Sequence, residues 1–178
     1  MTKDLTHRII DPVTGLIFPY YTHNFLEKLN TWNIENWRVF EYGGGDSTIW
    51  WRKKAKECIS IDTNKKWSES HELILLQNKE EFINYPCKLV EETGQLFDCI
   101  IIDNEPVQWR DFCTEMAIKC IRDGGILIID NWLQNSIEGL GENDWHKSKK
   151  LLKNYNCEIF KQNNHKDWKT GYWMITRD

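Results

Sequence analysis

The stretch Val39-Phe-Glu-Tyr-Gly-Gly-Gly-Asp-Ser-Thr-Ile49 decides the fold of this 178-residue chain. An apolar strand runs into three glycines, and a helical segment begins directly after them. Glycine is needed where the backbone turns tightly and lies against a ligand, because a Cβ would block both the dihedral angles and the approach. The next apolar strand, Cys58-Ile-Ser-Ile-Asp62, ends on a carboxylate that can accept hydrogen bonds from a ribose diol. Together the two stretches predict a site for a nucleotide-type cofactor.

Length and composition set the frame for that site. A chain of 178 residues is long enough for one domain with a central sheet and helices on both faces. We expect residues 1–36 to form a cap over the substrate and residues 37–178 to form the cofactor-binding core. The net charge of −4 argues against a general nucleic-acid or membrane binder, since such a protein carries a basic face. The oligomeric state is not predicted.

The cysteines and the N-terminus predict a cytoplasmic protein. The six cysteines include no Cys-x-x-Cys pair, and at least Cys58 and Cys99 fall inside apolar strand-like runs. They are interpreted as reduced core residues. The N-terminal segment MTKDLTHRII is polar and lacks the apolar run of a signal peptide. No segment approaches the roughly 20 apolar residues of a membrane span.

Apolar strand-like runs alternate with amphipathic helical runs along the chain, which predicts a mainly parallel sheet. The connection between the last two strands is too short for a parallel crossover and favours an antiparallel hairpin. The expected fold is therefore α/β and doubly wound, with a mainly parallel seven-stranded sheet, helices on both faces and a C-terminal antiparallel hairpin. The expected strands are 38–42, 58–62, 87–90, 97–103, 126–130, 157–161 and 171–176. The expected helices are 21–30, one from 46 or 47, 65–77, 106–121 and 144–154.

Two families share this glycine turn, and one position in it distinguishes them. A dinucleotide dehydrogenase has a third glycine where this chain has Thr48. The chain instead resembles the class I S-adenosylmethionine-dependent methyltransferases, through Glu41-Tyr-Gly-Gly-Gly-Asp-Ser-Thr48, Asp62, the strand from Phe97 to Asp103 and the stretch Asp123-Gly-Gly-Ile-Leu-Ile-Ile-Asp130. The closing hairpin agrees with that family. The resemblance covers about residues 37 to 178.

This resemblance implies a set of cofactor contacts. Gly43 and Gly45 would approach the methionine part of S-adenosylmethionine, Glu41 would support its amino group, and Asp62 would bind its ribose. Ser47 also has a simpler interpretation as a helix cap, and the glycines one as turn residues. Trp67 is interpreted either as a wall for the adenine or as packing. The candidate cofactor-binding residues are Glu41, Gly43, Gly45, Ser47, Asp62 and Asp103.

Two strand ends carry the candidate chemistry. Asp103 ends one strand, and Asp130 with Asn131 ends the next, so all three side chains are expected at the carboxyl edge of the sheet. Two carboxylates and an amide oxygen suit Mg²⁺ or another hard divalent cation. The arrangement resembles the metal-dependent, catechol-type O-methyltransferases, in which these positions hold the ion. Those enzymes have a lysine base three residues after the first Asp, where this chain has Pro106.

A second resemblance leads to a metal-free site. Small bacterial methyltransferases resemble this chain through the glycine turn and the paired Trp50-Trp51. In that interpretation Asp103 orients the substrate or acts as the base, and Glu105 is a further candidate base. His23 is a third candidate, because the N-terminal segment often folds over the acceptor in this family. His146 is interpreted as a surface residue.

The predicted function is methyl transfer from S-adenosylmethionine to a hydroxyl oxygen of a small molecule or a glycan. Phe18, Tyr20 and Tyr21 could line the acceptor pocket or form the apolar side of the cap. The alternative from another class is a non-catalytic binding or scaffold protein with the same fold, suggested by Pro106. A nicotinamide-dependent oxidoreductase is disfavoured by Thr48. A nucleic-acid methyltransferase stays open, but the chain has no motif of the Asn-Pro-Pro-Tyr type.

Overall fold

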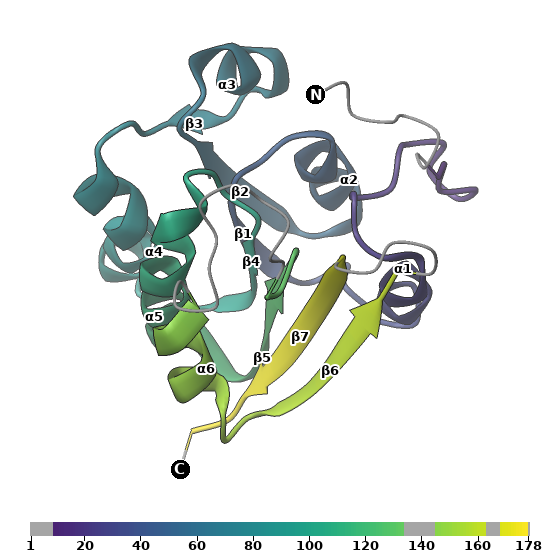
Figure 1. Cartoon of the computed structure of the whole chain (residues 1–178). Helices are drawn as coiled ribbons and strands as arrows, with labels where there is room; N and C mark the ends of the chain where they lie inside the picture. The colour runs from purple at the N-terminus through teal and green to yellow at the C-terminus, as the bar shows by residue number, and fades with distance from the viewer. Residues whose placement is uncertain (1–8, 134–144, 163–167, 178) are drawn as a thin grey trace.

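The computed structural model describes residues 9–133, 145–162 and 168–177. These residues form a seven-stranded sheet in the order β3-β2-β1-β4-β5-β7-β6, flanked by helices (Figure 1). The strands are β1 Arg38–Tyr42, β2 Glu57–Asp62, β3 Ile74–Leu75, β4 Phe97–Ile102, β5 Ile121–Ile129, β6 Asn156–Lys161 and β7 Lys169–Ile175. The helices are α1 His23–Leu29, α2 Asp46–Lys54, α3 Lys65–His71, α4 Lys79–Thr93, α5 Arg110–Cys120 and α6 His146–Leu152, with a 3₁₀ turn at Val107–Trp109 before α5.

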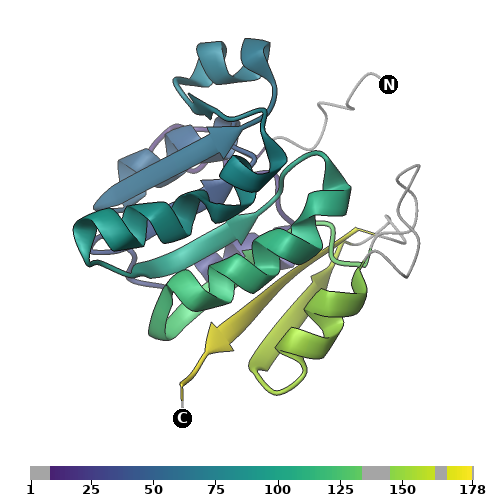
Figure 2. The same cartoon turned by 90° about the vertical axis from the view of Figure 1, so that its left-hand side faces the viewer.

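The sheet separates two apolar cores. Helices α4, α5 and α6 cover one face, while α1 and α2 cover the other (Figures 1 and 2). Consecutive residues of the central strands point to opposite faces, as the period of two in a β-strand requires. Ile100 and Ile102 of β4 pack into the core under α4 and α5, and Cys99 and Ile101 pack into the core under α1 and α2. Burial on both faces explains why these strands read as unbroken apolar runs in the sequence.

The paired tryptophans of α2 are core residues. Trp50 and Trp51 are buried and meet edge to face, with ring centroids 5.0 Å apart. Trp50 Nε1 donates to the Asp11 carboxylate at 2.9 Å, and the Lys54 ammonium lies 3.3 Å from the same oxygen. Burial alone would raise the pKa of Asp11, but these bonds and one from the Val13 amide outweigh it and lower that pKa to about 2. The pair thereby anchors the N-terminal segment to α2.

The sequence-based prediction was wrong between β2 and β4. The strand expected at residues 87–90 is part of α4, and the third strand is the short β3 at Ile74–Leu75. Asn78 caps α4 by accepting a hydrogen bond from the Glu81 amide at 3.0 Å. Pro86 lies buried within the same helix. The expected helix 65–77 ends early, at His71 of α3.

The C-terminal hairpin is confirmed. β7 runs antiparallel to both β5 and β6, while the β1, β2, β3, β4 and β5 pairings are parallel. The buried amide of Thr22 donates to Thr170 Oγ1 at 3.0 Å, so the segment before α1 is fastened to the start of β7. Across the three described ranges, no helix combines the length and the apolar character needed to cross a bilayer.

Candidate cofactor and acceptor site

The candidate site lies where the strand order reverses, between β1 and β4. In open α/β sheets, ligands bind in the crevice beyond the carboxyl ends of the strands at such a reversal. Gly43 leaves β1 with a φ of 82°, and a Cβ added there would lie 2.5 Å from the carbonyl oxygen of Asp103 and 2.5 Å from the Cα of Asn104. The first glycine is therefore required because the turn crosses directly over the loop that follows β4.

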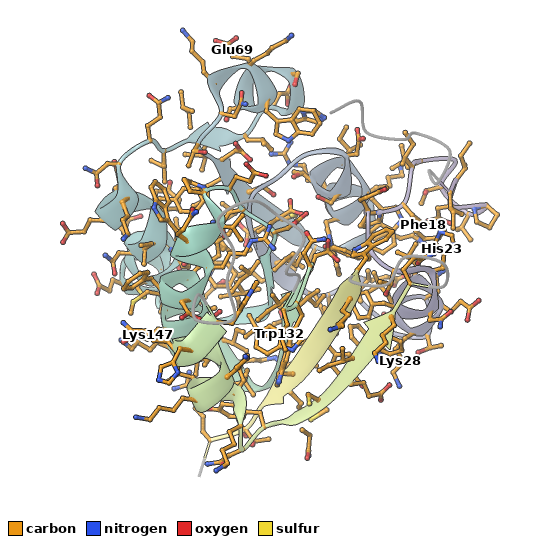
Figure 3. The ribbon with its side chains drawn as sticks, viewed as in Figure 1. Phe18, His23, Lys28, Glu69, Trp132 and Lys147 are labelled. Carbon is orange, nitrogen blue, oxygen red and sulfur yellow. The ribbon has the colours of Figure 1, made fainter. Side chains whose placement is uncertain are left out.

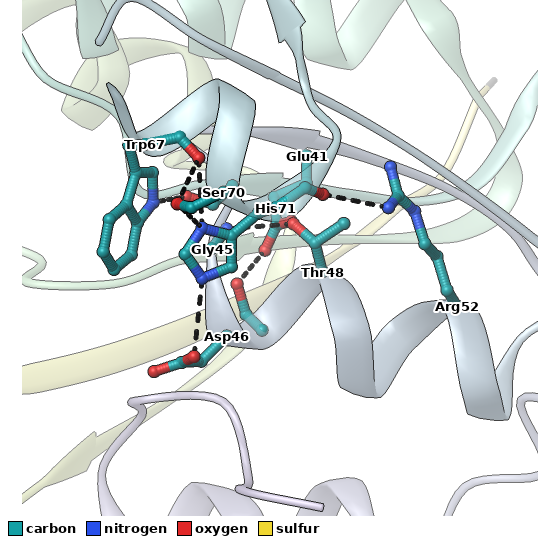
Figure 4. A network of polar contacts seen from close by, with 10 residues as sticks. Glu41, Gly45, Asp46, Thr48, Arg52, Trp67, Ser70 and His71 are labelled. Atoms are coloured by element: carbon teal, nitrogen blue, oxygen red, sulfur yellow. Dashed lines mark hydrogen bonds and ion pairs between the residues drawn. The ribbon is translucent and has the colours of Figure 1, made fainter. Parts of the chain in front are cut away.

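Trp67 of α3 packs on the same turn. A Cβ at Gly45 would lie 2.7 Å from its indole ring, and its Nε1 donates a hydrogen bond to the carbonyl oxygen of Gly44. The indole also packs on the His71 ring at a centroid distance of 4.2 Å, and His71 Nε2 lies 3.5 Å from Asp46 Oδ1 (Figure 4). The absence of a side chain at Gly45 thus allows α3 to dock on the turn.

Glu41 lies beneath the turn and is fully buried. Three hydroxyl groups donate to its carboxylate: Ser47 Oγ at 2.5 Å, Thr48 Oγ1 at 2.5 Å and Ser60 Oγ at 2.8 Å. Thr48 Oγ1 also accepts from the Gly45 amide at 3.0 Å. Burial raises the pKa of Glu41 to about 7, although the three hydroxyl donors oppose the rise. Glu41 and Ser47, expected at the cofactor, are therefore turned toward each other and hold the turn in shape.

Asp62 ends β2 on the opposite side of the turn. Its Oδ1 accepts the Asn64 amide at 2.7 Å, which fixes the carboxylate at the start of the following loop. Partial burial raises the pKa of Asp62, and the charges of Asp103 and Glu105 add to the rise. Thr63 Oγ1 donates to the carbonyl oxygen of Glu105 at 3.1 Å, so the loops after β2 and β4 meet above β1. The three predicted acidic residues therefore share one neighbourhood.

Asp103 and its partner Arg110 connect the loops after β4 and β5. The Asp103 side chain is 32% exposed and Arg110 is 3% exposed. Arg110 Nη2 lies 3.1 Å from Asp103 Oδ1, Nε donates to the carbonyl oxygen of Asn104 at 2.9 Å, and Nη1 donates to that of Asp130 at 2.7 Å. Each bond is charge-assisted and buried or partly buried, which strengthens it relative to a bond in water. The exposed part of Asp103 faces the solvent from a rigidly held loop.

Asp130 is a buried acid at the end of β5. Its Oδ1 accepts from Thr170 Oγ1 at 2.6 Å, and Trp168 Nε1 lies 3.2 Å from Oδ1 and 3.4 Å from Oδ2. Burial raises the pKa of Asp130 to about 8, and the charge of Asp103 raises it further. Asn131 follows with a φ of 54°, in the left-handed conformation that asparagine tolerates better than most residues.

These contacts do not favour the expected metal site. A ligand carboxylate must be ionised and must turn its oxygens toward the ion. The Asp130 carboxylate instead accepts hydrogen bonds from Thr170 Oγ1 of β7 and from Trp168 Nε1 just before that strand. Among the described residues, no group of three or more histidine, cysteine, aspartate or glutamate side chains is placed to hold a metal. The roles of Asp103, Asp130 and Asn131 as ligands therefore stay an untested prediction.

The N-terminal segment lies beside the residues that lead into β7. Tyr20 is 46% exposed and stacks on Trp168, with ring centroids 4.7 Å apart and planes 20° apart. The His23 amide donates to Gln162 Oε1 at 2.9 Å, and His23 lies on the same side of the molecule as Phe18 (Figure 3). Phe18 and Tyr21 are buried in the core under α1 and α2. Tyr20 is therefore the aromatic residue of this segment with a surface open to an acceptor.

Two of the expected residues lie apart from this arrangement or at its margin. Glu105 is exposed on the loop after β4, where its carbonyl oxygen rather than its carboxylate makes the contact to Thr63. His146 begins α6, next to Lys147, which Figure 3 places across the molecule from His23. Sequence reasoning missed Arg110 altogether. The available signal was the charged pair Arg110-Asp111 at the start of α5, and both members are buried.

No family model matches the sequence, and no curated protein matches it. Solved structures do match. The O-methyltransferase from Bacillus cereus in complex with SAH is 16% identical, with a TM-score of 0.64 over 97% of this chain and 84% of that one. The O-methyltransferase TomG from Streptomyces achromogenes, involved in tomaymycin synthesis and solved with SAM, is 15% identical, with a TM-score of 0.63 over 86% of this chain and 77% of that one.

A third match contains a metal. The MycE methyltransferase of the mycinamycin biosynthetic pathway, in complex with Mg and SAH, is 13% identical, with a TM-score of 0.57 over 86% of this chain and 48% of that one. At such identities the likeness establishes the fold and not the activity. The chain has the Rossmann-like fold found in class I S-adenosylmethionine-dependent methyltransferases, which confirms the fold expected from the sequence.

Substituting alanine at Gly43 tests the close crossing of the turn. Gly94 is the matched control, because it also has a positive φ, of 69°, but a Cβ there would meet nothing within 4 Å. We expect Gly94→Ala to lower the free energy of unfolding by about 1–2 kcal/mol through backbone strain. Gly43→Ala should cost about 1–3 kcal/mol more through overpacking. Chemical denaturation measures both, and equal losses would contradict the crossing.

The buried carboxyl of Glu41 predicts a pH dependence of stability. Its folded-state pKa of about 7 lies above the ordinary value of 4.5, so the folded state binds the proton more tightly. This contribution is present below the ordinary value and is lost as pH rises through 7, a change on the order of 3 kcal/mol. The raised pKa of Asp130 likewise makes the free energy of unfolding fall as pH rises. We expect unfolding free energies measured between pH 5 and pH 8 to fall less steeply in Glu41→Gln, whereas the exposed Glu35→Gln should keep the original slope.

Proposed function

We propose that this chain is an S-adenosylmethionine-dependent methyltransferase that acts on a hydroxyl oxygen of a small molecule or a glycan. The observation that carries the proposal is the meeting of the glycine turn, Asp62 and Asp103 at the reversal between β1 and β4, in a sheet closed by an antiparallel β7. The Bacillus cereus and Streptomyces achromogenes O-methyltransferases that share the fold were solved with SAH and SAM, which supports the cofactor.

The charge of the crevice favours this cofactor over a dinucleotide. A pyrophosphate binds at a helix N-terminus that is free of negative charge. Here Asp46 is the first residue of α2, and Asp62 and Asp103 stand on either side of the turn. S-adenosylmethionine instead carries a sulfonium and an ammonium group, which acidic side chains attract. Asp62 would accept the ribose hydroxyls, while Glu41 would act indirectly by holding the glycine turn.

The reaction requires alignment more than covalent chemistry. Methyl transfer from a sulfonium is an in-line displacement, so a fixed acceptor and donor account for most of the acceleration. Asp103 is the proposed base, because Arg110 holds its loop and part of its carboxylate reaches the solvent. Glu105, exposed on the same loop, is the second candidate. If a divalent cation binds, the proposed ligands are Asp103, Asp130 and Asn131.

One observation favours the alternative of a non-catalytic binding protein with this fold. The Trp67 indole already covers Gly45 and hydrogen bonds to Gly44. A cofactor lying against that part of the turn would have to share the space with the indole. A scaffold would need no such space. Calorimetric titration with the cofactor, described next, separates the two functions.

Calorimetric titration with S-adenosylmethionine, S-adenosylhomocysteine and NAD, each with and without Mg²⁺, tests the proposal. We expect micromolar binding of the first two ligands and none of NAD. Asp62→Ala should weaken binding at least tenfold, since it removes charge-assisted hydrogen bonds worth about 1.5–3 kcal/mol each. Glu69→Ala is the control, because Glu69 is an exposed acid on the outer side of α3 (Figure 3).

The outcomes separate the alternatives. Binding that depends on Mg²⁺ would support the metal site at Asp103, Asp130 and Asn131. If neither adenosyl ligand binds a protein whose circular dichroism shows it to be folded, the methyltransferase proposal fails and the scaffold function replaces it. Equal losses in Asp62→Ala and Glu69→Ala would reject Asp62 as the ribose ligand.

A further inference from the structure

Two cysteines from different helices lie in direct contact. They are on the opposite face of the sheet from α2, the helix that follows the glycine turn. Cys87 belongs to α4 and Cys120 is the last residue of α5. Their Sγ atoms are 3.0 Å apart, and the Met116 sulfur lies 3.9 Å from Cys87 Sγ. A disulfide bond is about 2.05 Å long, so the sulfurs need to approach by only about 1 Å to be joined. Neither residue belongs to the candidate cofactor site.

The two thiols differ in a way that assigns them different roles. Cys87 is half-buried, and its hydrogen bond with Cys120, assisted by the Lys119 ammonium, lowers its pKa to about 7 against the effect of burial. Cys120 is buried, and its contact with Cys87 and its burial raise its pKa. A partly accessible thiolate reacts with oxidants, and a second cysteine in contact with it can resolve the sulfenic acid as its own proton passes to the leaving oxygen.

We propose that Cys87 and Cys120 are a site of reversible oxidation that joins α4 to α5 by a disulfide bond in the presence of a peroxide. The Cys87 thiolate attacks one peroxide oxygen, the O–O bond breaks, and hydroxide leaves with the electron pair and is protonated to water. Cys120 sulfur then attacks the Cys87 sulfenic acid, the S–O bond breaks, and a second water leaves with the Cys120 proton. Two thiols and one hydrogen peroxide become one disulfide and two waters.

The bond would act on the helix that organises the site. α5 begins at Arg110, which fastens the loops after β4 and β5, and ends at Cys120. A link from Cys120 to Cys87 closes a loop of the chain and removes conformational freedom from the unfolded state. It therefore stabilises the α4 and α5 pair over this whole face of the sheet. The inference does not depend on the proposed function, since it concerns two sulfurs outside the crevice.

Oxidation of the full chain by hydrogen peroxide tests the site. We expect the intact mass to fall by two hydrogens, a peptide map to join the segments that contain Cys87 and Cys120, and dithiothreitol to reverse both changes. The Tm should rise by about 5–10 °C, as loop closure by a native-like disulfide implies. Cys87→Ser should abolish the mass loss and the rise in Tm. The control is Cys157→Ser, because Cys157 is an exposed cysteine on β6 and its loss should change neither.

A second variant separates the two chemical steps. Cys120→Ser keeps the attacking thiol but removes the resolving one, so we expect a sulfenic acid at Cys87 that dimedone labels. The proposal is overturned if oxidised wild-type protein carries only added oxygen, or if the cross-link joins other cysteines. It is equally overturned if the mass loss persists in Cys87→Ser. Peptide mapping of wild-type protein decides the matter by itself if either variant does not fold.

Discussion

The buried guanidinium of Arg110 is the interaction on which the acidic edge of this sheet depends. Carboxyl groups of neighbouring strands repel each other, and burial increases the cost of that repulsion. Arg110 binds the Asp103 carboxylate and the carbonyl oxygens of Asn104 and Asp130, so one cation connects the ends of β4 and β5. Breaking such a buried arrangement by removing one partner costs far more than its net contribution suggests. The crevice can hold several acids because this residue is present.

The glycines of the turn have a structural role in this protein. A glycine-rich turn is usually explained by the ligand that lies on it, but here Gly43 accommodates the loop after β4 and Gly45 accommodates Trp67. The Glu41 carboxylate below the turn accepts hydrogen bonds from three hydroxyl groups. These residues are therefore needed for the packing of the turn itself. The motif alone does not demonstrate a cofactor. The charge of the crevice and its position in the sheet carry the functional argument instead.

The sequence predicted most of the fold because its strands are long apolar runs with clear ends. It failed at residues 87–90, where a short apolar stretch was interpreted as a strand although it belongs to α4. For the site, the positions of Asp62 and Asp103 followed from strand ends. The hydrogen-bond partners of Asp130 could not be predicted from strand ends. Trp168 and Thr170 are 38 and 40 residues away in sequence, and no local pattern connects them to Asp130. Arg110 was missed for another reason, since charged residues at the start of a helix usually face the solvent and this one is buried.

The hydrogen bond from Thr22 to Thr170 spans 148 residues of sequence. Thr170 also donates to Asp130, so β7 holds both the segment before α1 and the end of β5. A ribosome delivers the chain from its N-terminus, and segments made early must wait for those made late. Until β7 is added, the Thr22 amide lacks its acceptor and Asp130 lacks the hydroxyl of Thr170. The contacts that fasten the segment before α1 to the end of β5 thus form only after β7 has joined the sheet.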